Sequence, residues 1–160
     1  MKWQELCEDK SLANLPYKIE LDRQGKIIMS PTRNKHGFFQ ARIAAWLQQL
    51  LPHGFALTEC AVDTSEGTIV ADATWASAER FKIIQDEFSC SIAPEICVEI
   101  WSESNTPAEI ENKRKLYIGK GAVEFWYCDE RGRITFYDAQ SKLPASKLCP
   151  EFPHSIWPPE

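Results

Sequence analysis

The chain has 160 residues, of which 44% are hydrophobic and 26% are charged, and its formal net charge is −5. This length suits one domain with a buried core, so we expect residues 1–160 to form a single domain. No apolar run is long enough to cross a bilayer, and the first residues, MKWQELCEDK, lack the apolar stretch of a secretory signal. We therefore expect a cytoplasmic protein with no membrane partner.

The charge pattern argues against a basic coat for non-specific nucleic-acid binding, although it permits a local basic groove. Two segments have the necessary lysines and arginines, residues 23–42 and residues 113–120. Each segment also fits an ordinary solvated surface. The six cysteines show neither a Cys-x-x-Cys pair nor zinc-finger spacing, so we expect free and mostly buried thiols.

The first half of the chain predicts a short helix, a β-hairpin, a long helix and two strands. The hairpin turns at Arg23-Gln24-Gly25, and apolar residues at helical spacing indicate the long helix. We expect these elements over residues 2–9, 15–31, 34–51, 55–62 and 68–75. A weaker helical pattern follows over residues 77–88.

The second half opens on a buried strand in PEICVEIWSES, residues 94–104. A helix begins after Thr106, because threonine is a favourable N-cap, Pro107 suits the first helical position and Glu109 completes a capping box.

The remaining elements are a helix end near residue 119, strands over residues 123–129 and 133–139, and a tail from residue 140. The tail holds five of the ten prolines, so we expect it to run over the surface. This order predicts an α/β (α+β) domain with a mixed central sheet, flanking helices and an N-terminal hairpin.

Two predicted strands each carry one carboxylate among apolar neighbours, Asp72 in TIVADATW and Glu99 in PEICVEIWSES. A buried carboxylate is costly without a partner. If the two strands are neighbours, the acids meet at one site, where Mg²⁺ or Mn²⁺ would bridge them together with a backbone carbonyl, for which we nominate Ile100. Taken singly, each acid also fits a strand-end residue that faces water or pairs with a lysine.

The helix after Thr106 supplies a cation. Lys113 lies four residues after Glu109 and four before Tyr117, on one helical face that could return over the strand end. A lysine there can orient a nucleophilic water or offset charge on phosphate. An exposed pair between Glu109 and Lys113 is the alternative.

Several motifs together resemble the Uma-two family of restriction-endonuclease-like proteins, within the PD-(D/E)xK nuclease superfamily. They extend over nearly the whole chain and include LPYKIEL followed by GKIIMSP, VEIWSES, NKRKLY and GAVEFWYCD. The resemblance implies a restriction-endonuclease-like fold and hydrolysis of phosphodiester bonds in DNA with Mg²⁺ or Mn²⁺.

The resemblance also implies roles for individual residues. Asp72 and Glu99 match the metal-binding acids of the superfamily, while Trp101 stands where the superfamily lysine is expected. Lys113, in the pattern Lys-x-x-x-Tyr, matches a lysine that has moved to the following helix. Two further positions match family residues that could support the site, namely Glu20 and His36.

Three functional hypotheses remain open at this point. The first is a metal-dependent DNA endonuclease, with a symmetric homodimer as one way to cut both strands. The second is a non-catalytic module that keeps the fold as a dimer or a partner-binding subunit. The third is phosphodiester chemistry on RNA or a nucleotide, which the same residues would support.

Overall fold

The computed structural model describes residues 1–103 and 105–158, so Ser104, which ends the VEIWSES motif, lies outside them. The helices found there are α1 (Trp3–Glu8), the 3-10 helix η1 (Lys10–Leu12), α2 (Asn34–Leu50), α3 (Ala78–Ile84) and α4 (Pro107–Gly119). Helices α1, α2 and α4 begin and end close to the predicted positions, whereas α3 is shorter and η1 was not predicted. No helix in these two ranges has both the length and the hydropathy needed to cross a membrane.

The strands form two sheets. The smaller sheet is the antiparallel hairpin of β1 (Tyr17–Leu21) and β2 (Ile27–Pro31). The larger sheet has the order β3 (Gly54–Thr64), β4 (Gly67–Ser77), β5 (Ile96–Ile100), β6 (Glu124–Cys128), β7 (Ile134–Tyr137) and β8 (Lys142–Leu143). Only β5 and β6 run parallel, connected through α4. This mixed sheet with flanking helices confirms the predicted fold class.

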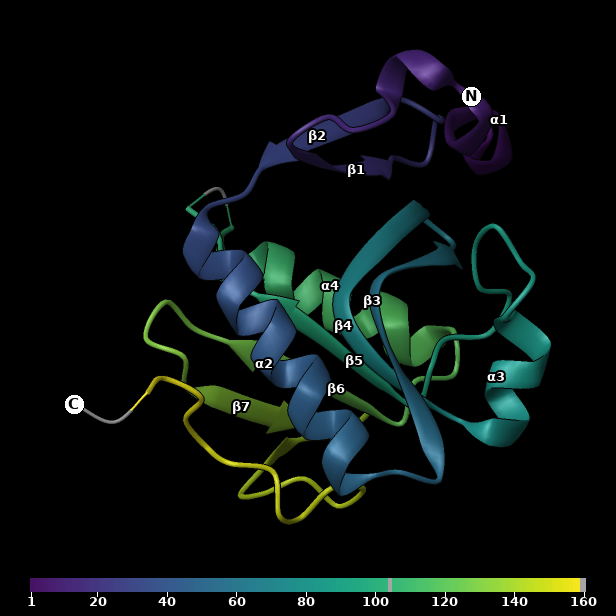
Figure 1. Cartoon of the computed structure of the whole chain (residues 1–160). Helices are drawn as coiled ribbons and strands as arrows, with labels where there is room; N and C mark the ends of the chain where they lie inside the picture. The colour runs from purple at the N-terminus through teal and green to yellow at the C-terminus, as the bar shows by residue number, and fades with distance from the viewer. Residues whose placement is uncertain (104, 159–160) are drawn as a thin grey trace.

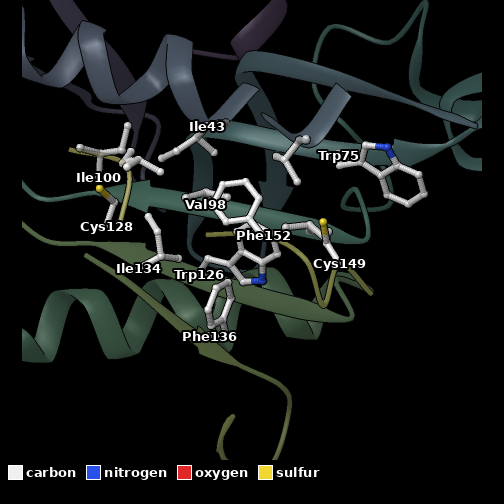
Figure 2. Packing of buried hydrophobic residues seen from close by; sticks show 14 of the residues in the cluster. Ile43, Trp75, Val98, Ile100, Trp126, Cys128, Ile134, Phe136, Cys149 and Phe152 are labelled. Carbon is white, nitrogen blue, oxygen red and sulfur yellow. The ribbon is translucent and has the colours of Figure 1, made fainter. Parts of the chain in front are cut away.

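Helices cover both faces of the large sheet, and the N-terminal hairpin lies beyond one end of β4 (Figure 1). The alternation of side chains along β5 explains the two faces, since Val98 packs in the cluster that includes α2 whereas Cys97 packs in the cluster that includes α4. Figure 2 shows the first cluster, in which Ile43 of α2 lies above Val98 and Trp126. The sheet therefore has a buried apolar layer on each side.

The C-terminal tail corrects one prediction, because it does not simply run over the surface. Cys149, Phe152 and Ile156 are buried in the cluster below α2, and the Phe152 ring lies 4.6 Å from that of Trp126 (Figure 2). Prolines prevent regular secondary structure, but they leave the intervening side chains free to enter a core. The apolar side chains of the tail, and not its prolines, therefore decide where it packs.

Helix α3 is shorter than the predicted residues 77–88. Ser77 caps its first turn by accepting a hydrogen bond from the Arg80 N–H. The helix ends at Ile84, and Glu87 then accepts hydrogen bonds from the main chain and side chain of Ser91. These contacts stabilise a turn where a further helical turn was predicted.

The pairing of β4 with β5 is brief, and this creates the site described next. The strands pair at three positions, of which Ala73 with Val98 is the last. Beyond that pair the hairpin lies against β4, and the Glu20 carboxylate accepts the Val70 N–H at 2.8 Å. The Glu20 side chain thus accepts a hydrogen bond from a β4 N–H group that has no neighbouring strand to bond to.

Candidate active site

Asp72 and Glu99 are the next residues of β4 and β5 after the last strand pair, Ala73 with Val98. Residues opposite each other in antiparallel strands project to the same side of the sheet. Both acids are almost completely buried, with 0% of Asp72 and 2% of Glu99 exposed. The structure therefore brings together the two carboxylates that the sequence predicted to meet.

Asp72 is held by contacts from three elements, β5, β1 and α2. Its Oδ2 accepts the Ile100 N–H at 2.7 Å, and its Oδ1 lies 3.1 Å from both Lys18 Nζ and His36 Nε2. Its main-chain oxygen accepts a hydrogen bond from the Gln40 side chain at 2.8 Å. His36 is buried in the first turn of α2, so it belongs to the site and does not face the solvent.

The strand opposite Asp72 departs from regular geometry at Glu59. Pairing of β3 with β4 includes Thr58 and Cys60 but omits Glu59, whose φ of 52° lies in the left-handed region. Gln40 bonds both to the Glu59 carboxylate, at 2.6 Å, and to the Asp72 carbonyl. A helix side chain thus supplies the hydrogen bond that the strand partner does not make, and such distortion is typical of functional sites.

Glu99 uses its two oxygens differently. Oε1 accepts the Tyr117 hydroxyl at 2.6 Å, whereas Oε2 lies 3.2 Å from Lys18 Nζ and 3.4 Å from Lys113 Nζ. Tyr117 is fully buried, so its hydroxyl fixes the carboxylate orientation and leaves Oε2 directed at the cations.

Glu20 and Lys113 form the adjoining part of the site. The Lys113 ammonium lies 3.3 Å from both oxygens of Glu20. Glu109, the alternative partner of Lys113, instead completes the capping box with Thr106. Lys113 therefore points from α4 toward β1 and β5. The alternative interpretation, an exposed pair between Glu109 and Lys113, is wrong.

Burial and neighbouring charges act on the pKa values in opposite directions. Burial would raise the pKa of Asp72, but Lys18 and His36 outweigh it and hold that pKa below the ordinary value. Burial likewise raises the pKa of Glu99, against the opposing effects of Lys113 and Lys18. Burial would lower the pKa of Lys18, but Glu99 and Asp72 outweigh it, so its pKa is raised and the ammonium stays protonated.

The donor set fits a hard divalent cation. Asp72 Oδ1 and Glu99 Oε2 converge on one positive group, the Lys18 ammonium, so their oxygens can share a cation. Among the residues that the structure describes, no three His, Cys, Asp or Glu side chains gather as a metal centre. A cation held here would take its protein ligands from the two carboxylates and a main-chain oxygen.

Two cavities with shared lining residues lie at this site. A hollow of about 40 Å³ lies against Asp72, Glu99 and Lys113, and a larger cavity of about 610 Å³ shares Ser102 and His36 with it. The larger cavity is also lined by basic and aromatic side chains, namely Arg33, Lys35, Phe39 and Trp101. Arg23 of the same basic segment lines a separate hollow beside α1, so the segment does not form one groove.

Lys18 is the residue that the sequence argument missed. It alternates with Glu20 on β1, so both side chains lie on one face of the strand, and this period of two was a usable signal. Tyr117 is fully buried, and its hydrogen bond to Glu99 was not predicted from the sequence. Neither helical nor strand periodicity alone indicates which buried hydroxyl meets a carboxylate.

Comparison with known proteins identifies the family and the fold. The model of the Uma2 family, described as "Putative restriction endonuclease", matches residues 3–150. The chain belongs to the Uma2 family. All the residues described above at the candidate site lie within the matched residues.

A solved structure shows the same fold. The chain is similar to the crystal structure described as a "putative nuclease belonging to DUF820" from Anabaena variabilis ATCC 29413, with a TM-score of 0.72 and 18% sequence identity. The alignment covers 98% of this chain and 95% of that one. No curated protein matches the chain.

Proposed function

We propose that this Uma2 protein is a cytoplasmic endonuclease that depends on Mg²⁺ or Mn²⁺ and hydrolyses phosphodiester bonds in DNA. One observation carries the proposal: two buried carboxylates, just past the end of the pairing between β4 and β5, direct one oxygen each at the same positive group, the Lys18 ammonium. Structural acids are seldom buried in this way unless they are paired or bind metal. Family membership supports nuclease chemistry, and a homodimer would suit cutting of both strands.

Each residue has a distinct task in this proposal. Asp72, Glu99 and the Ile100 main-chain oxygen would hold the cation, which when bound makes water more acidic and offsets charge on phosphate. Lys113, 3.4 Å from Glu99, orients the attacking water and stabilises negative charge that develops on phosphate. Glu20 positions Lys113, and His36 positions the Asp72 carboxylate.

The substrate would approach over the cavity beside the site. Lys35 provides positive charge at the wall of this cavity in an otherwise acidic protein, whereas Arg33 is paired there with the Glu103 carboxylate. Because so few basic residues face the site, binding to a phosphate backbone should weaken steeply as salt concentration rises.

A non-catalytic module is the second candidate, and one contact favours it. The Lys18 ammonium already neutralises part of the charge of Asp72 and Glu99, so the carboxylate pair is stable without metal. In that case the fold would serve as a dimeric or partner-binding unit.

Cleavage assays separate these functions. The purified protein is expected to cut DNA with Mg²⁺ or Mn²⁺ at low ionic strength and to stop on addition of EDTA. Duplex, single-stranded and branched DNA and RNA should be tested in parallel, since the site residues would serve any of them. The control is Asp72→Asn/Glu99→Gln, purified identically. Equal product from wild type and double mutant on every substrate would favour the non-catalytic module.

A further inference from the structure

Lys18 occupies the point at which a divalent cation would bind. Its ammonium lies 3.1 Å from Asp72 Oδ1 and 3.2 Å from Glu99 Oε2, and only 8% of its side chain is exposed. Lys113 differs, because its closest partner is the Glu20 carboxylate and it contacts only Glu99 of the metal-binding pair. Lys18 is therefore the ammonium that bridges the two candidate ligands.

The charge balance of the site favours replacement of this ammonium. Three carboxylates, those of Glu20, Asp72 and Glu99, face the two ammonium groups of Lys18 and Lys113. With His36, which also lies 3.1 Å from Asp72 Oδ1, counted as neutral, one negative charge is left over. Exchange of the Lys18 ammonium for a divalent cation would cancel this excess, and a buried site gains most from exact neutrality.

The structure also offers the displaced side chain another place. A hollow of about 500 Å³ is lined by Lys18 itself, Gln40 and Glu59. Glu59 is exposed and bears a carboxylate that can accept an ammonium group. The long lysine stem lets its head move between partners while β1 stays in place.

We propose that Lys18 is a tethered cation that holds the Asp72 and Glu99 pair together in the metal-free protein and must leave before a divalent metal binds. This inference rests on the proposed function, because it assumes that the carboxylate pair binds metal. Lys18 would then compete with the metal for the two carboxylates, so the site would fill only above the metal concentration that is needed to displace the ammonium.

Mn²⁺ titration calorimetry on three variants tests the competition. Lys18→Met is expected to bind Mn²⁺ at least about 10-fold more tightly than wild type, because the affinity of a site that is blocked most of the time falls in proportion to the fraction of molecules in which it is open. Lys113→Met removes the same charge without removing the bridge, so its gain should be clearly smaller. Lys142→Met, on β8 at the far edge of the sheet, is the surface control and should match wild type.

The outcomes are distinct. If Lys18→Met gains no more affinity than Lys113→Met, Lys18 is only a nearby charge and the inference is overturned while metal binding stands. If neither wild type nor Lys18→Met binds Mn²⁺, both the inference and the metal-dependent function fail. If only Lys18→Met binds, the competition is confirmed and the wild-type chain is the non-catalytic module.

A second measurement uses the wild-type chain and does not depend on the folding of a variant. Acetylation of lysines by an activated ester, followed by peptide mass spectrometry, reports how accessible each amine is. Lys18 should react slowly in EDTA and several-fold faster with saturating Mn²⁺, whereas Lys142 should react equally in both. Unchanged protection of Lys18 in the metal-bound protein would overturn the proposed displacement.

Discussion

Asp72→Asn is expected to lower the rate of DNA cleavage by at least about 1000-fold while the protein stays folded. Loss of a single electrostatic contact to a transition state can cost about 100- to 1000-fold. This substitution goes further, because it removes a carboxylate that would hold the metal. The amide keeps the size of the side chain, and its oxygen can still accept the Ile100 N–H. Initial cleavage rates at saturating Mn²⁺ give the measurement, with circular dichroism as the check on folding.

Glu124→Gln is the matched control for Asp72→Asn. Glu124 is a buried strand carboxylate outside the candidate site, 1% exposed, and it accepts hydrogen bonds from Trp126, Ser146 and the Lys147 N–H. Its loss should lower the free energy of unfolding but leave the cleavage rate per folded molecule unchanged. A comparable loss of rate in both variants would mean that Asp72 acts through stability.

Lys113→Met is expected to reduce cleavage by about 100-fold or more, the range of a positioned proton-transfer or charge-stabilising group. Mn²⁺ should still bind, because Lys113 is not a ligand. The reduction should therefore appear in turnover per folded molecule at saturating metal, because loss of the ion pairs with Glu20 and Glu99 also lowers the free energy of unfolding.

The control for Lys113 comes from the same helix. Lys115 is exposed and lies two residues further along α4, so Lys115→Met removes an equal charge on another face. It should leave cleavage unchanged. Full activity of Lys113→Met would reject the proposed role of this lysine and make Lys18 the next residue to test.

The sequence predicted most of the fold because periodicity records which faces are buried. Apolar spacing placed α2, and the capping box of Thr106 and Glu109 placed the start of α4. The fate of the tail was missed for a physical reason. Its prolines restrict only the local backbone conformation, whereas burial of Phe152 depends on packing against α2 and against strands that are distant in the sequence.

The site was predictable only in part. Single carboxylates within apolar strands indicated Asp72 and Glu99, since burying a charge requires a partner. Strand spacing places Lys18 on the same face of β1 as Glu20, but it does not place Lys18 against Asp72 and Glu99, which are 54 and 81 residues away and are reached only through the packing of the hairpin on β4. Long-range contacts of this kind follow from tertiary structure and leave little local trace.

The most direct measurement of the central claim is the stoichiometry of Mn²⁺ binding in the wild type and in Asp72→Asn/Glu99→Gln. Calorimetry or the loss of the free Mn²⁺ electron paramagnetic resonance signal gives the number of ions bound per chain. We expect saturable binding to the wild type that requires both carboxylates and is competed by Mg²⁺. Equal Mn²⁺ binding by the wild type and the double mutant, or none by either, would contradict a metal site at Asp72 and Glu99.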